Sequence, residues 1–121
     1  IPLTTRGMSE SFWVITGTTK DHNLSNDLSL AAQSSATVVV LMGMHKLPEI
    51  VETFAQLGKM DLPVAIIQNG SRPDEKIVTG KVNNILQLVQ AEGIGSPAII
   101  VIGKVAQLAD KVKEITQLAD Y

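Results

Sequence analysis

The residues of this chain that could do chemistry lie at glycine-marked ends of apolar runs, not in a cluster of acids, bases or nucleophiles. A β-branched run over residues 36–44 ends in Met42, Gly43 and Met44. Other runs end at Thr16-Gly17, Asn69-Gly70 and Thr79-Gly80, and the last run begins at Pro97-Ala98. If these ends converge, they form a cleft with backbone donors and acceptors and a polarizable thioether, which suits an adenosine-bearing cofactor with a sulfur centre. The alternative is that they are ordinary strand ends with core-packing methionines.

Several other kinds of site are excluded by the residue types. The chain has no cysteine, which removes disulfides, thiolate catalysis and cysteine metal sites. The chain has two histidines, His22 and His45, which are too few for a histidine metal site, so no metal site is expected. Residues 93–98 fit the dinucleotide pattern G-x-G-x-x-A, but they precede an apolar run instead of following one, so their amides are not predicted to cradle a phosphate.

Composition limits the size of the fold and the partners. The chain of 121 residues is predicted to be a single domain, residues 1–121, with an aliphatic core, because 45% of it is apolar and only 3% aromatic. A net charge of -2 without a basic run argues against nucleic acid. No apolar stretch reaches the roughly 18 residues needed to span a bilayer. We therefore expect no membrane partner and a cytoplasmic location. The chain begins at Ile1 and is expected to be part of something longer.

The elements that must position these residues follow from hydrophobic periodicity. Apolar runs predict strands over 11–17, from 36, over 63–68, 76–80 and 97–103. Helical spacing predicts a short helix from 27, and helices over 47–57, 82–92 and 105–119. The run from 36 lacks polar alternation and is predicted to be buried on both faces. The predicted fold is therefore α/β, with a mixed and mainly buried sheet of about five strands flanked by helices, and ligands at carboxyl strand ends.

In order along the chain, these segments resemble the tetrapyrrole methylases, and among them the uroporphyrinogen-III C-methyltransferases. The resemblance covers residues 1 to about 103 and matches the C-terminal half of the family. The segments that carry it are IPLTTRG at 1–7, FWVITG at 12–17, LMGM at 41–44, LPEI at 47–50, NGSRP at 69–73, VTG at 78–80 and PAIIVIG at 97–103.

The resemblance implies an enzyme that moves the methyl group of S-adenosyl-L-methionine onto ring carbons of uroporphyrinogen III, giving precorrin-2 and S-adenosyl-L-homocysteine. By this resemblance, the cofactor would contact Met42, Gly43, Gly70, Pro97 and Ala98. The tetrapyrrole would face Arg6, Met44 and Thr18. An arginine suits a substrate with eight carboxylates, because a guanidinium binds a carboxylate bidentately.

The family's pattern also has parts that this chain lacks. Thr5 and Thr18 stand where the family commonly has histidines, which leaves the tetrapyrrole contact at Thr18 and the choice of substrate open. The glycine-rich N-terminal lobe that holds the methionine part of the cofactor is absent from residues 1–121. The chain is thus expected to be the C-terminal lobe of a two-lobe enzyme, to pair with its own N-terminal lobe, to form a homodimer, and to be inactive alone.

Two other functions remain open from the sequence. The protein could methylate a later corrin precursor, which the two threonines permit. It could also be a non-catalytic α/β domain whose work is to pair subunits through its C-terminal amphipathic helix.

Overall fold

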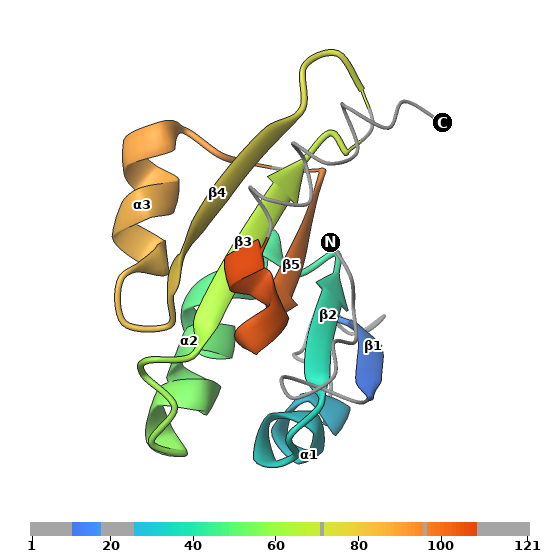
Figure 1. Ribbon diagram of the computed structural model, residues 1–121, viewed down its shortest axis with the longest axis vertical. Helices are drawn as coiled ribbons and strands as arrows, with labels where there is room; N and C mark the ends of the chain where they lie inside the picture. The colour runs from blue at the N-terminus through green and yellow to red at the C-terminus, as the bar shows by residue number, and fades with distance from the viewer. Residues whose placement is uncertain (1–10, 18–25, 71, 96, 109–121) are drawn as a thin grey trace.

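The structure of this chain is a computed structural model that describes residues 11–17, 26–70, 72–95 and 97–108. These ranges hold five strands, three α-helices and two short 3-10 helices (Figure 1). The strands are β1 (Phe12–Thr16), β2 (Thr37–Leu41), β3 (Pro63–Gln68), β4 (Lys76–Lys81) and β5 (Ala98–Ile102). The α-helices are α1 (Asp27–Gln33), α2 (Leu47–Gln56) and α3 (Ile85–Glu92), and the 3-10 helices are η1 (Met44–Lys46) and η2 (Lys104–Leu108).

The five strands form one mixed sheet in the order β1-β2-β5-β3-β4. β1 pairs with β2 in parallel, and every other neighbouring pair is antiparallel. β5 therefore lies between β2 and β3, and these two run in the same direction on either side of it. The predicted fold class, a mixed sheet of about five strands flanked by helices, is confirmed.

The core lies on both faces of the central strands. Val38 and Val40 of β2 belong to the main cluster, where Phe54 of α2 is 1% exposed. Val39, which points to the opposite face, packs in a smaller cluster with Ala106 of η2. Figure 1 agrees, with η2 in front of β3 and β5 and α2 behind the sheet. The prediction that β2 is buried on both faces holds for its first four residues, and Leu41 at its end is exposed.

Local signals account for the boundaries of α2. Pro48 lies in its first turn, where a missing N–H costs no helical hydrogen bond. Gly58 follows the helix with a φ of +75°, a left-handed conformation that glycine adopts without a Cβ penalty. Between these two residues, Ile50 and Phe54 turn the apolar face of the helix to the sheet. The helix predicted over 47–57 is confirmed.

The end of the described chain differs from the sequence prediction. A helix was expected from Val105 to Ala119, and the structure has the 3-10 helix η2 over Lys104–Leu108. The N–H of Ala106 donates to the carbonyl of Gly103 across three residues, so the chain turns tightly as soon as β5 ends. The rest of the predicted helix lies outside the described residues.

The strand directions decide which predicted strand ends meet. The carboxyl ends of β1, β2 and β3 lie at the same end of the sheet as the start of β5, because β5 is antiparallel to β2 and β3. Gly17 and Gly43 lie against each other there, since a Cβ on Gly17 would be 2.6 Å from the Cα of Gly43. Gly80 does not join them. It pairs with Val64 near the start of β3, at the opposite end of the strands, and packs against Leu88 of α3.

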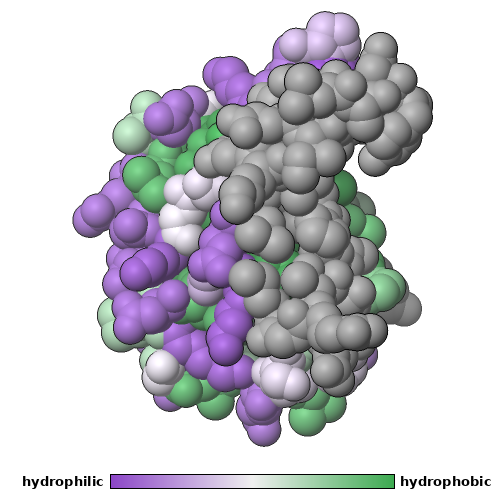
Figure 2. Space-filling model, viewed as in Figure 1, coloured by the Kyte–Doolittle hydropathy of each residue, from purple (hydrophilic) through white to green (hydrophobic). Residues whose placement is uncertain are grey.

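The surface carries both polar and apolar residues. In Figure 2, hydrophilic residues are prominent on the side that carries α3 and β4, with hydrophobic residues between them, and further hydrophobic residues are visible at the opposite margin. Phe12, Val14, Leu41 and Ile99 are the exposed apolar side chains of β1, β2 and β5 that share the sheet face opposite the α-helices. None of the helices in the described ranges has the length and apolar character needed to cross a membrane.

Candidate functional site

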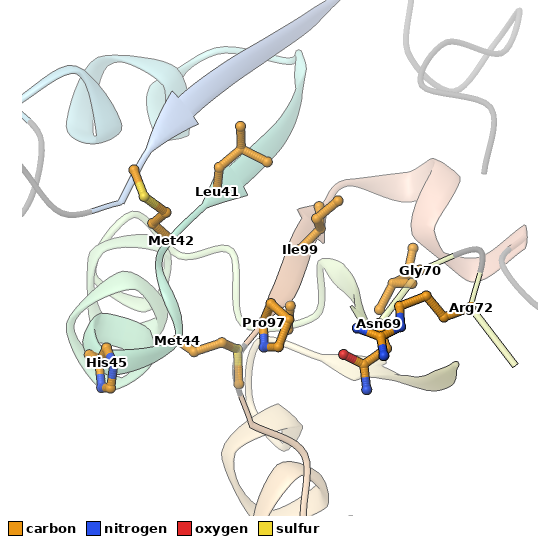
Figure 3. A pocket seen from close by; sticks show the side chains of 11 residues that line it. Leu41, Met42, Met44, His45, Asn69, Gly70, Arg72, Pro97 and Ile99 are labelled. Carbon is orange, nitrogen blue, oxygen red and sulfur yellow. The ribbon is translucent and has the colours of Figure 1, made fainter. Parts of the chain in front are cut away.

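A cavity of about 620 Å³ opens where β2 and β3 end and β5 begins (Figure 3). This volume lies within the range of small-molecule sites. The cavity is lined by Leu41, Met42, Met44, His45, Ile67, Asn69, Gly70, Arg72, Pro97, Ala98 and Ile99. It therefore occupies the carboxyl ends of two strands that run in the same direction, which is the kind of place where ligands gather in open α/β sheets.

The walls of this cavity are mostly apolar. Aliphatic, thioether and proline side chains form most of the lining, and the polar side chains come from His45, Asn69 and Arg72. In Figure 3, His45 stands at one side of the cavity and Asn69 and Arg72 stand together at the other. None of the described residues that line it is an acid. Such a site can hold a flat, largely apolar group between its walls and orient it through the polar side chains at its two sides.

The backbone is strained on both sides of the start of β5. Met42, directly after β2, has a φ of 53°, and Asn69, directly after β3, has a φ of 54°. They are the non-glycine residues of the described chain with positive φ. A left-handed residue with a Cβ costs about 1–2 kcal/mol, somewhat less for asparagine. Strain of this kind persists where the surrounding structure enforces it, and it often marks functional sites.

The left-handed turn after β3 is closed by several hydrogen bonds. The N–H of Asn69 donates to the carbonyl of Pro97 at 3.1 Å, which ties the turn to the segment before β5. The carbonyl of Asn69 accepts from the N–H of Arg72 at 3.1 Å. The side-chain amide of Asn69 donates to Asp74 at 3.1 Å. These hydrogen bonds fix the conformation of the turn that forms this side of the cavity rim.

Five of the residues predicted for the site line this one cavity. Met42, Gly70, Pro97 and Ala98, expected at the cofactor, are joined there by Met44, expected at the tetrapyrrole. Met42 is 67% exposed, unusual for a methionine that only packs a core. In Figure 3 the side chain of Met42 extends toward β1 and that of Met44 toward Pro97.

The remaining predicted residues do not line the cavity in the described chain. Gly43 is buried beneath the turn, where a Cβ would be 2.6 Å from Val40 and 3.1 Å from Ile50. Its absence of a side chain lets the chain bend tightly over the core after β2. Arg6 and Thr18 lie outside the described residues.

Sequence reasoning did not assign several lining residues to the site. Among these is Asn69, which has the positive φ in the turn after β3, whereas Gly70 does not. The Asn-Gly pair was a usable signal, because asparagine tolerates the left-handed region and favours turns. His45 and Ile99 gave no such signal. They reach the cavity through the 3-10 turn η1 and through the pairing of β5.

Two smaller cavities lie elsewhere. One of about 390 Å³ lies at the opposite end of the strands, where β2 and β3 begin. There the ammonium of Lys59 donates to the carbonyls of Ala32 and Ser34. Another of about 250 Å³ separates η1 from α3. Within the described ranges, no three His, Cys, Asp or Glu residues lie together as a metal site would need.

With this geometry in view, comparison with known proteins places the chain in a family. The model of the family Tetrapyrrole (Corrin/Porphyrin) Methylases matches residues 1–86. This chain belongs to that family of methyltransferases. A siroheme synthase from Pseudoalteromonas translucida is 34% identical over 109 residues, which are 89% of this chain and 23% of that protein.

Solved structures agree with the family. A uroporphyrin-III C-methyl transferase from Thermus thermophilus, complexed with S-adenyl homocysteine, superposes with a TM-score of 0.75 at 27% identity. The match covers 88% of this chain and 48% of that one. A cobalt precorrin-4 methyltransferase has the same fold, with a TM-score of 0.74 at 21% identity over 84% of this chain and 43% of the other. The chain thus spans about a quarter of the curated relative and just under half of these structures.

Proposed function

We propose that this chain is the C-terminal lobe of an S-adenosyl-L-methionine-dependent enzyme that C-methylates uroporphyrinogen III to precorrin-2. The observation that carries the proposal is the gathering of Met42, Met44, Gly70, Pro97 and Ala98 around one cavity. These are residues that the resemblance to uroporphyrinogen-III C-methyltransferases nominates for cofactor and substrate. Membership of the family and the likeness to a structure that holds S-adenyl homocysteine support it.

The cavity fits the adenosine part of this cofactor. Its volume of about 620 Å³ accommodates a nucleoside, and its walls of Leu41, Ile67 and Ile99 suit a flat ring. Pro97 and Ala98 would lie beside the adenine, and Met42 and Gly70 would contact the nucleoside from the ends of β2 and β3. Gly43 would act from beneath, by letting the turn after β2 pass close to the ligand.

The tetrapyrrole would be held on the other side of the bound nucleoside. Met44 would face the macrocycle, and Arg6 would bind one of its carboxylates through a charge-assisted pair. Thr18 would take the place that a histidine commonly has in the family. An apolar side chain such as Met44 together with a guanidinium suits a substrate with a hydrophobic ring and a carboxylate rim.

The residues of this lobe would promote the reaction by orientation and by excluding water. Bound S-adenosylmethionine supplies an electrophilic methyl group on a sulfonium centre. The lining contains no carboxylate among its described residues, so this lobe offers walls and hydrogen bonds instead of a strong base. Fixing the nucleoside in one pose removes much of the entropic barrier to an in-line transfer. No metal is needed for this chemistry.

The direct test uses the protein at the full length that its gene encodes. Purified protein is incubated with uroporphyrinogen III and S-adenosylmethionine carrying a labelled methyl group, and products are separated by mass. We expect two labelled methyl groups per tetrapyrrole and one S-adenosylhomocysteine for each. If uroporphyrinogen III stays unlabelled and a later corrin precursor, supplied in a parallel incubation, takes the label, that alternative, which Thr5 and Thr18 leave open, replaces the proposal. Absence of cofactor binding would favour a non-catalytic pairing domain.

A further inference from the structure

Asn69 joins two of the segments that form the cavity. It follows β3, lines the cavity, and donates its backbone N–H to the carbonyl of Pro97 at 3.1 Å. Pro97 is the residue that the proposed function sets beside the adenine. The backbone of Asn69 is left-handed, with a φ of 54°, and its side chain lies with that of Arg72 at one side of the cavity (Figure 3). A polar side chain is thus held next to the proposed adenine site.

Asp74 determines which way the amide of Asn69 faces. The Nδ2 of Asn69 donates to Oδ2 of Asp74 at 3.1 Å. An ionised carboxylate can only accept hydrogen bonds, so it selects the amide orientation with the NH₂ group toward Asp74. The carbonyl oxygen of the amide is then presented on the other side. In Figure 3 this oxygen points toward the side of Pro97.

Arg72 supports this arrangement from the same turn. Its Nε lies 3.5 Å from Oδ1 of Asp74, and its backbone N–H donates to the carbonyl of Asn69. The ion pair is exposed and contributes little stability by itself. Its effect is geometric, because it occupies one oxygen of Asp74 and leaves the other for Asn69.

We propose that the side-chain oxygen of Asn69 accepts a hydrogen bond from the exocyclic amino group of the bound adenine, with Asp74 as the positioning residue. This inference rests on the proposed function. An oxygen that cannot exchange places with its NH₂ group is a pure acceptor, and the amino group of adenine is a pure donor. A hypoxanthine ring, with a carbonyl oxygen at that position, would set two acceptors against each other. The turn after β3 therefore selects the base.

The ribose is the other possible partner of Asn69, but it suits this oxygen less well. A ribose hydroxyl both donates and accepts, so a fixed acceptor would not be required to bind it. The turn also bonds directly to Pro97, which flanks the proposed base position. These two observations favour the amino group.

The experiment compares S-adenosylhomocysteine with S-inosylhomocysteine in the full-length protein by calorimetry. Wild type should bind the adenosyl ligand roughly 10-fold more tightly, which is the size of one buried hydrogen bond. In Asn69→Gly, glycine keeps the left-handed backbone while the oxygen is lost, and the ratio should fall toward 1. Asn83→Gly, in a turn distant from the cavity, should keep the wild-type ratio.

Substitutions of Asp74 test its positioning role. Asp74→Ala should lower the ratio of the two affinities, whereas Asp74→Asn, whose amide oxygen can still accept from Asn69, should restore part of it. Glu92→Ala, an exposed acid at the end of α3, is the matched control. A merely structural role of Asp74 would weaken both ligands equally.

The failures of the two proposals can be told apart. If wild type binds neither ligand, the proposed function fails. If it binds S-adenosylhomocysteine and the ratio is unchanged in Asn69→Gly, the inference about Asn69 is wrong. A loss of Asn69 dependence with a 2′-deoxyribose analogue, instead of with the inosyl ligand, would move the contact to the ribose and also overturn it.

Discussion

Met42 and Asn69 occupy equivalent places on the two sides of β5. Each is the first residue after a strand, each has a left-handed backbone, and each lines the same cavity. A glycine would adopt this backbone without the cost of a Cβ. The presence of side chains at both positions indicates that these side chains, and not only the turns, serve the site. The side-chain amide of Asn69 donates a hydrogen bond to Asp74, and the side chain of Met42 stays largely exposed.

Two substitutions at Met42 separate its side chain from its backbone. Met42→Ala and Met42→Gly both remove the thioether, and we expect each to weaken S-adenosylhomocysteine binding several-fold in the full-length protein. Alanine retains the left-handed strain that glycine relieves, so the glycine variant should be more stable by about 1 kcal/mol. Calorimetry and urea unfolding measure the two quantities.

Met60 provides the control for this pair. It is 51% exposed and lies away from the cavity, so Met60→Ala should change neither affinity nor stability. Unchanged affinity in both Met42 variants would remove Met42 from the site.

At the scale of elements, the site depends on how closely β1 and β2 end together. The N–H of Gly17 donates to the carbonyl of Leu41 at 2.6 Å, and Gly17 and Gly43 are both buried. A Cβ on Gly17 would lie 2.6 Å from the Cα of Gly43, which is backbone and cannot rotate away. Gly43 directly precedes η1, which carries the lining residues Met44 and His45.

Gly17→Ala should therefore force β1 away from the turn after β2. We expect a loss of roughly 1–3 kcal/mol in the free energy of unfolding, as in other overpacked sites. Urea unfolding followed by circular dichroism measures it. Gly95→Ala is the matched control, because nothing lies within 4 Å of its added Cβ and its φ is not positive. Equal stability of the two variants would contradict the close contact.

At the scale of the whole molecule, the described residues form one five-stranded sheet with an open cavity at the ends of its strands. The sheet face opposite the α-helices carries exposed apolar side chains near the cavity edge, among them Leu41 and Ile99. Homologous structures are about twice as long, since the match to the Thermus thermophilus transferase covers 48% of that chain. We propose that an N-terminal lobe completes the cavity. The homodimer and the cytoplasmic location stay predictions.

The 121-residue chain by itself should consequently yield no precorrin-2 from uroporphyrinogen III, while the full-length protein does. The physical reason is that half of the walls that orient the cofactor and exclude water would be missing. Absorbance and mass of the tetrapyrrole products measure the difference. Detectable precorrin-2 from the purified 121-residue chain would show this prediction to be wrong.

Local patterns in the sequence determined most elements of this fold. Proline and glycine at the ends of an amphipathic stripe predicted α2, and β-branched runs predicted all five strands, because these signals act within a few residues. The positions of Met42 and Gly70 could also be proposed from the sequence, through the ordered family resemblance. Gly80 was grouped with them wrongly, because a glycine after an apolar run does not indicate the direction of its strand, and hence not at which end of the sheet the glycine lies.

Only the tertiary structure decided which strand ends meet. The insertion of β5 between β2 and β3 is a long-range pairing that no local signal encodes, and it brings Pro97 and Ala98 between Met42 and Asn69. The antiparallel pairing of β4 with β3 places Gly80 beside Val64, at the opposite end of the strands from the cavity. The bond from Asn69 to Asp74 likewise depends on the three-dimensional path of one turn. The strands follow from residue types, and the site follows from their order and direction.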